Sequence, residues 1–155
     1  MAKKLALLGI AALVGGAVVG VMSASAAAPS GQTYLDHTVK GTYVDNGAHG
    51  FSAGDEFVFH DVLKQNGTRK GTIDGFCKIT DVVGKNAATD QCNATAKLAN
   101  GQIAFQAGGK NLGTSNHSFQ IGIVGGTDAY RTARGWAVIK PINQNDSRIT
   151  VYVTP

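Results

Sequence analysis

One stretch of the sequence places an acid where acid–base chemistry needs it. In "GDEFVFHDVL", Asp61 follows Phe57 and Phe59 at every second position, so an extended strand puts all three on one face. If that face looks inward, Asp61 lies among apolar side chains, where an ionised carboxylate is costly unless it is paired or hydrogen-bonded. It must find a cation, keep its proton or be reached by water, as a working acid or base does. The alternative is a rim position, hydrogen-bonded to loop backbone.

A second stretch, "GGTDAYRTARG", combines glycines, an acid and two arginines near the end of the chain. Asp128 could transfer a proton, and Arg134 could offset developing negative charge. The structural alternative is a tight turn in which Arg131 and Arg134 hold the corner by pairing with Asp128 or with carbonyl oxygens. A phosphate-binding loop is excluded, because no strand–loop–helix context surrounds the glycines.

The elements that must position these residues are short strands. Apolar residues alternate with polar ones, and Asn-Gly pairs mark tight hairpins. Many antiparallel strands in one small domain form a sandwich or a barrel, since their edges would otherwise stay open. The pattern predicts eight strands over about 38–44, 55–64, 70–82, 91–98, 102–108, 117–124, 133–142 and 148–154.

The start of the chain predicts export. Lys3 and Lys4 precede an apolar run, and small residues follow it up to a predicted signal-peptidase cleavage near Ala26. A retained membrane anchor is the alternative, because the run is just long enough to span a bilayer. Its glycines and its Ala-x-Ala ending favour cleavage, which predicts a secreted protein with no membrane contact afterwards. The predicted organisation is a signal peptide over 1–26, a flexible N-terminal segment over 27–37 and a barrel domain over 38–155.

The two cysteines, Cys77 and Cys92, are predicted to form a disulfide, because exported proteins oxidise paired thiols. The alternative is two buried thiols that never meet. A catalytic thiol is disfavoured, since no histidine is close to either cysteine in sequence.

Charge and composition exclude several kinds of partner. The net charge of +4 falls to about +2 without Lys3 and Lys4, and no basic stripe interleaves with aromatics, so no nucleic-acid partner is expected. We expect no metal and no cofactor, because the four histidines have no metal-ligand spacing. They are His37, His49, His60 and His117.

Two motifs in this sequence resemble those of a known family. "EFVFHDVL" is similar to the first-strand Phe-x-Phe-His-Asp-Ile-Leu signature of dirigent proteins, and "IVGGTDAYRTARGWA" is similar to their late Gly-Gly-Thr signature. The broader resemblance, from about Gly54 to Val153, is to small exported bacterial proteins of the allene oxide cyclase barrel-like class. It implies an all-β fold, an eight-stranded antiparallel barrel with a hydrophobic cavity, and a dimer or trimer, since the plant relatives often form trimers.

The resemblance also implies a function and its residues. Dirigent proteins guide the coupling of phenoxy radicals, and allene oxide cyclases hold an unstable epoxide while it closes, so a small hydrophobic molecule is the expected partner. The expectation is a cyclase-like, isomerase-like or dirigent activity, with a non-catalytic exported binding or surface protein as the alternative. The catalytic candidates are Asp61, Asp128 and Arg134, and the ligand-binding candidates are Phe57, Phe59, Tyr130 and Arg131. The cyclase's own catalytic constellation has no counterpart here.

Overall fold

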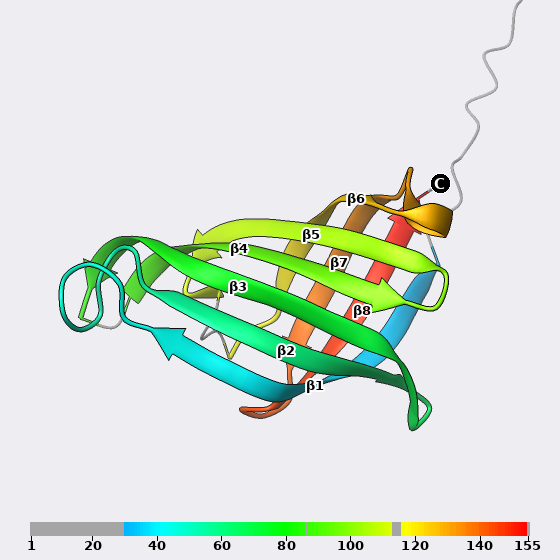
Figure 1. Ribbon diagram of the computed structural model, residues 1–155, viewed down its shortest axis with the longest axis horizontal. Helices are drawn as coiled ribbons and strands as arrows, with labels where there is room; N and C mark the ends of the chain where they lie inside the picture. Colours follow the sequence, from blue (N-terminus) through cyan, green and yellow to red (C-terminus); the bar gives the residue numbers. More distant parts are fainter. Residues whose placement is uncertain (1–29, 86, 113–115, 155) are drawn as a thin grey trace, which may run out of the picture.

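Alternating side chains build a closed antiparallel barrel, as the resemblance implies (Figure 1). The computed structural model describes residues 30–85, 87–112 and 116–154. Each strand pairs with its neighbours in sequence, and β1 pairs with β8 to close the sheet. The strands are β1 (Gly31–Val44), β2 (Glu56–Gln65), β3 (Thr68–Gly84), β4 (Ala87–Leu98), β5 (Gly101–Lys110), β6 (Phe119–Gly126), β7 (Arg134–Pro141) and β8 (Asp146–Thr154). All eight predicted strands are present.

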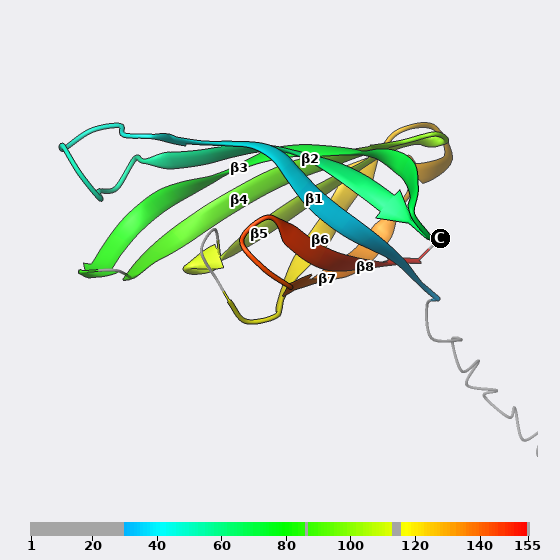
Figure 2. The same cartoon turned by 90° about the horizontal axis from the view of Figure 1, so that it is seen from below.

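The first strand is longer than predicted. It begins at Gly31, and residues 31–37 pair with β8 from Gly31↔Tyr152 to His37↔Asp146. The prediction of a flexible segment is therefore wrong for residues 31–37, because closing the barrel requires this part of β1 to cover the edge of β8. Figure 2 shows β1 running between β2 and β8. The predicted signal peptide and its cleavage site lie outside the described residues.

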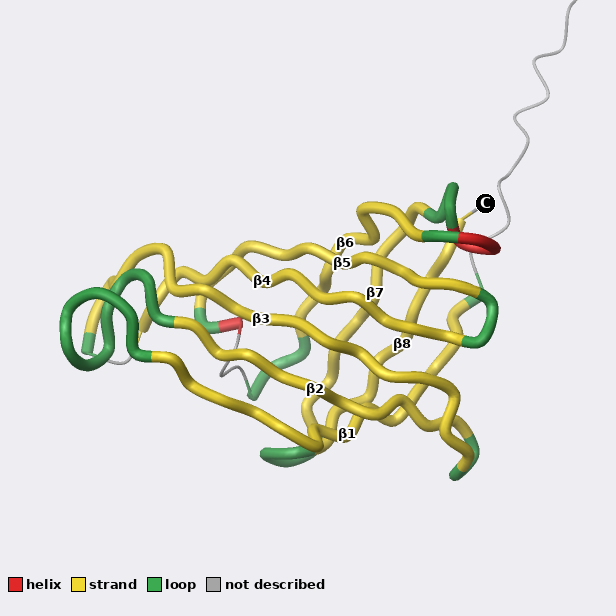
Figure 3. The backbone as a smooth tube through the Cα atoms, in the orientation of Figure 1, coloured by secondary structure: helices red, strands yellow, loops and turns green. Residues whose placement is uncertain are grey.

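The two ends of the barrel carry different connections, because a meander turns at alternate ends. We call the wide end the one that carries the β1–β2, β3–β4, β5–β6 and β7–β8 connections. The narrow end carries the β2–β3 and β4–β5 turns, the short 3-10 helix η2 (Asp128–Tyr130) and both ends of the described chain (Figures 1 and 3). Within the described ranges no helix is long and apolar enough to cross a membrane.

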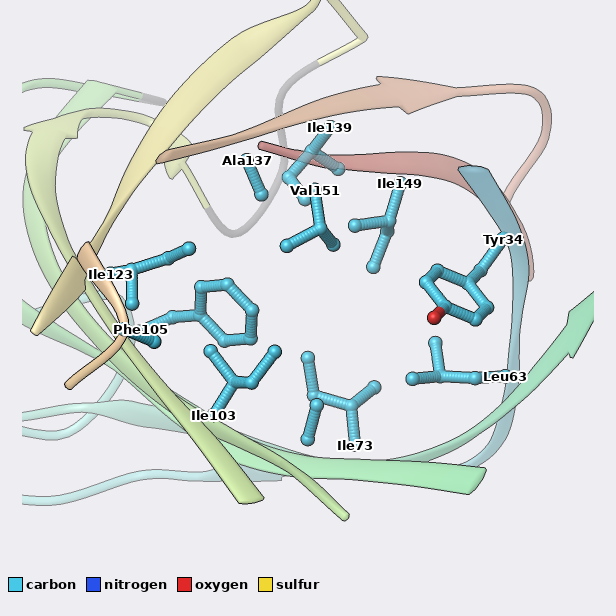
Figure 4. Packing of buried hydrophobic residues seen from close by; sticks show 12 residues of the cluster. Tyr34, Leu63, Ile73, Ile103, Phe105, Ile123, Ala137, Ile139, Ile149 and Val151 are labelled. Atoms are coloured by element: carbon cyan, nitrogen blue, oxygen red, sulfur yellow. The ribbon is translucent and has the colours of Figure 1, made fainter. Parts of the chain in front are cut away.

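The core fills the narrow half of the barrel. Figure 4 shows side chains from the surrounding strands pointing toward one another across the lumen, among them Leu63, Ile73, Phe105 and Ile149. Each of these four is at least nine-tenths buried. Phe105 is therefore an inward residue, as its alternation predicts, and it helps to close the lumen at this level.

Asp55 fixes the β1–β2 connection at the wide end. Its carboxylate accepts hydrogen bonds from the Tyr43 hydroxyl at 2.5 Å, from the Asn46 amide at 2.9 Å and from the Ser52 amide at 2.7 Å. The bond from Tyr43 is the main reason that the pKa of Asp55 lies below its usual value. The backbone of Asp55 also bonds to Ile79 of β3, so this loop is anchored to the wall.

A disulfide joins Cys77 of β3 to Cys92 of β4, which confirms the predicted pairing. The two residues are direct cross-strand partners, with Cα atoms 4.0 Å apart. Both line the lumen at the wide end, so the bond ties two cavity-forming strands together.

Removing this disulfide should destabilise the barrel. A cross-link that closes a loop of this length restricts the unfolded chain, so the Cys77→Ser/Cys92→Ser variant should lose about 3 kcal/mol of unfolding free energy. Urea denaturation of the oxidised protein and the double variant measures the difference, with chemically reduced wild type as the control. Equal midpoints for oxidised and reduced protein would contradict the expectation.

Candidate functional site

Asp61 points into the lumen at the wide end. Its side chain lines a cavity of about 750 Å³, the wide cavity, together with Phe57 and Phe59 of the same strand. Only 5% of Asp61 is exposed. The predicted inward face of β2 is therefore confirmed, and the alternative of a solvated rim position is wrong. His60, which alternates with Asp61, lies on the outer wall, where it pairs with Asp74.

A second acid, which the sequence interpretation missed, lies beside Asp61. Asp36 of β1 is 8% exposed and lines the same cavity. In the β1–β2 register Asp61 pairs with Thr38 and Leu63 pairs with Asp36, so the two acids are diagonal neighbours on one face. The register shifts directly after Thr38, between Thr38 and Lys40. This bulge lets β1 continue toward the wide end past the acid pair.

Both carboxyl groups have pKa values above the usual aspartate value, so the fold favours their protonated forms. The pKa of Asp36 is raised to about 8, mainly by burial and in addition by the nearby charge of Asp61 and a hydrogen bond to Asp61. Burial also raises the pKa of Asp61, although hydrogen bonds from Thr38 and Asp36 oppose this effect. Asp36 therefore holds the proton and donates it to the Asp61 carboxylate.

Each acid keeps one oxygen available. Among the described residues, the buried side-chain atoms without a hydrogen-bond partner are Asp36 Oδ1 and Asp61 Oδ1. A buried polar atom without a partner is unfavourable, so it calls for an explanation. Because both residues line the wide cavity, a bound molecule could supply the missing bonds. The pair can offer a proton from one carboxyl and accept one at the other.

Aromatic rings form the apolar wall of the wide cavity. Phe57 and Phe59 stack with ring centroids 6.2 Å apart, and Phe119 of β6 lines the same space. Glycines make room for two of these rings: a Cβ on Gly41 would lie 2.8 Å from the Phe57 ring, and one on Gly75 would lie 2.6 Å from Phe59. The predicted ligand-binding positions Phe57 and Phe59 therefore face the space that holds the acid pair.

The other predicted site residues lie at the opposite end of the barrel. Asp128 and Arg131 are exposed at η2, and Arg134 is exposed at the start of β7, where its guanidinium donates to the Ala133 carbonyl at 2.8 Å. Tyr130 lines a separate narrow cavity of about 160 Å³. The structure does not bring these four residues together with Asp61, because the β6–β7 connection turns at the narrow end.

The corner at η2 has the turn role that the sequence analysis considered. Asp128 adopts a positive φ of 52° and accepts a hydrogen bond from the Thr127 hydroxyl at 2.9 Å. The predicted pairing of an arginine with a carbonyl is present at Arg134. These contacts hold the β6–β7 connection in place beside β5, whose Gln102 accepts from the Thr127 amide.

Neither cavity wall offers a metal site. Across residues 30–85, 87–112 and 116–154, no three histidines, cysteines or acids gather closely enough to hold a metal ion. Three histidines each pair with one aspartate: His37 with Asp146, His49 with Asp45 and His60 with Asp74.

No protein-family model matches the sequence, and no curated protein matches it. Solved structures share the fold. Pyocyanin demethylase has a TM-score of 0.72 and 23% identity over 81% of this chain and 100% of its own. A pterocarpan synthase dirigent protein has a TM-score of 0.61 and 16% identity, covering 80% of this chain and 88% of its own.

An exo-specific intermolecular Diels-Alderase has a TM-score of 0.63 and 15% identity, covering 80% of this chain and 98% of its own. These structures confirm that the barrel is of the dirigent and cyclase type, as the two motifs suggest. At these identities the likeness concerns the fold.

Proposed function

We propose that this barrel binds a small, largely aromatic molecule in the wide cavity and that Asp36 and Asp61 move protons during its cyclisation or coupling. The observation that carries the proposal is the pair of buried carboxyl groups, each with an oxygen that lacks a partner, in a cavity that phenylalanine and isoleucine side chains also line. A cavity of about 750 Å³ is of the size that ligand sites have in proteins. The shared fold with a dirigent protein and a Diels-Alderase supports the same class of reaction.

The chemistry that the pair supports is redox-neutral. The neutral carboxyl of Asp36 donates its proton to a carbonyl or quinone-like oxygen of the ligand, which makes the adjacent carbon more electrophilic. The Asp61 carboxylate accepts the proton of the attacking hydroxyl as the new bond forms. The proton then returns from Asp61 to Asp36 through their hydrogen bond, so no net proton is gained or lost. The apolar wall supports the reaction by orienting the ligand and excluding water.

Mass spectrometry of the protein purified from its native host tests the proposal. Solvent extraction should release an aromatic compound, and incubating that compound with fresh protein should give a product of the same mass but different retention for a cyclisation. The Ile121→Trp variant, which places an indole in the wide cavity, is the control and should release less compound. Failure to bind or convert any extracted compound would contradict the proposal and favour the non-catalytic alternative.

We also propose that the mature protein acts outside the cytoplasm. The Cys77–Cys92 disulfide supports this, because such bonds persist mainly in oxidising compartments. The protein recovered from culture medium should begin directly after Ala26 when its N-terminus is sequenced. A cell-retained protein that still begins at Met1 would contradict secretion.

A homo-oligomer, a dimer or a trimer, is part of the same proposal. Val58 and Phe76 are 41% and 38% exposed on the outer wall of β2 and β3, where a second copy could cover them. Light scattering of the purified protein gives the oligomer mass, and a monomer at all concentrations would contradict this part.

A further inference from the structure

The wide cavity is lined by two acidic side chains and, among its described lining residues, by no basic one. Asp36 and Asp61 line it, and none of its described lining residues is a lysine, an arginine or a histidine. The basic groups around it belong to outer-wall pairs: His60, whose charge acts on Asp61, lies against Asp74, and His37 lies against Asp146. Negative charge on the acid pair is therefore not neutralised by a side chain that lines the cavity.

This uncompensated charge is buried rather than solvated. Asp36 and Asp61 are 8% and 5% exposed, and each has a buried oxygen that makes no hydrogen bond within the described part of the chain. A buried charge is normally paired or bound to a counter-ion. The counter-charge that the cavity lacks must come from what it binds.

The rest of the wall restricts the kind of cation that fits. Phe57, Phe59 and Phe119 line the same cavity, and aromatic faces attract positive charge while stacking on flat rings. A compact ammonium ion would lose strong hydration against the phenylalanine faces. A charge spread over an aromatic ring loses less hydration and contacts both the rings and the acids.

We propose that the ligand of the wide cavity is a planar nitrogen-heteroaromatic cation and that the cavity rejects aromatic carboxylates. This inference rests on the proposed function, because it takes the wide cavity as the binding site. It deepens that function by naming the substrate class. The acid pair selects for positive charge, and the phenylalanine wall selects for a flat ring.

Three probes of one shape test the inference on the purified protein at neutral pH: N-methylacridinium, neutral acridine and acridine-9-carboxylate, followed by their fluorescence. The cation should bind about tenfold more tightly than neutral acridine, and the carboxylate about tenfold more weakly, because the buried charge attracts one and repels the other. In the Asp36→Asn/Asp61→Asn variant the cation and acridine should bind within about threefold of each other.

Asp74→Asn is the matched control, because it makes the same acid-to-amide change on the outer wall. This variant should bind the three probes with the same ranking of affinities as wild type. Equal binding of the cation and acridine to wild type would overturn charge selection and leave the proposed function standing. Tightest binding of acridine-9-carboxylate would also overturn charge selection and leave the proposed function standing. If none of the three probes binds, the wide cavity is not a site for aromatic ligands, and both the inference and the proposed function fail. If the double variant does not fold, the relative affinities of wild type for the three probes are sufficient to test the inference.

Discussion

Replacing Asp61 by asparagine should lower the rate of the proposed reaction by at least about 100-fold, the usual contribution of a positioned proton-transfer group. Asparagine has nearly the same shape and can still bond to Thr38 and Asp36, so the barrel should remain folded. It cannot accept the proton from the attacking group. Product formation from the compound extracted with the wild-type protein, measured at saturating concentration, gives the comparison.

Asp74→Asn provides the control for this variant. Asp74 lies on β3 directly after Ile73, the residue that pairs with Asp61, but its side chain faces the outer wall and pairs with Lys97 at 3.1 Å. An exposed pair of this kind contributes roughly 0–1 kcal/mol to stability. Turnover by Asp74→Asn should match wild type, and full turnover by Asp61→Asn would remove Asp61 from the mechanism.

The second large effect concerns stability and pH. Asp36 has a pKa of about 8 in the folded protein, far above the value of an exposed aspartate in the unfolded chain. Between these two values the folded state binds more protons than the unfolded state, so the free energy of unfolding falls as pH rises. Below this window both states are protonated, and above it both are ionised, so the slope disappears at each side.

Replacing Asp36 by asparagine should reduce this slope, and the raised pKa of Asp61 should account for the slope that remains. The variant should gain stability over wild type as pH rises toward 8, by at most about 5 kcal/mol, because it has no carboxyl group to ionise at position 36. Asp61 and Asp146, whose charges act on Asp36, are present in both wild type and the variant. Urea denaturation across the pH range measures the difference.

The same measurement on Asp146→Asn separates the causes. Asp146 raises the pKa of Asp36 only as the smallest of the four causes, so this variant should keep most of the wild-type slope. A wild-type stability that is flat between the two pKa values, or a slope in Asp36→Asn as steep as that of wild type, would contradict the raised pKa of Asp36.

Much of the fold follows from local sequence, because period-two alternation reports burial directly. The strand with Phe57, Phe59 and Asp61 shows the point: its inward face was predictable from three alternate positions. The disulfide was predictable from export and an even cysteine count. The prediction that the barrel closes came from the family resemblance, because alternation alone is also compatible with a β-sandwich.

The sequence did not predict Asp36, because β1 does not follow the usual burial pattern. Leu35 is 41% exposed while Asp36 beside it is buried, so the alternation places the polar residue inside. Val39, at the register shift, is also exposed and interrupts the period. From its sequence pattern, such a strand cannot be distinguished from a polar linker. Only its register with β2 shows that Asp36 lies beside Asp61.

The grouping of Asp61 with Asp128 and Arg134 failed for a topological reason. The family resemblance identifies which residues belong to the two motifs, but it does not say at which end of the barrel each motif lies. In an eight-stranded meander the connection after an even-numbered strand lies at the end where the chain enters, so the β6–β7 corner lies away from the wide end. Counting strands along the chain was the signal that could have separated the two groups.

The account depends on two acids that share one proton inside the barrel, and carboxyl-carbon NMR observes that proton most directly. In protein labelled with ¹³C at the aspartate side chains, a pH titration with Asp36→Asn and Asp61→Asn for assignment follows each carboxyl separately. The account predicts that one signal of the pair titrates near pH 8 and moves to lower pH when its partner becomes asparagine. If both carboxyl groups ionise together near the ordinary aspartate value, the acid pair and the chemistry proposed for it are contradicted.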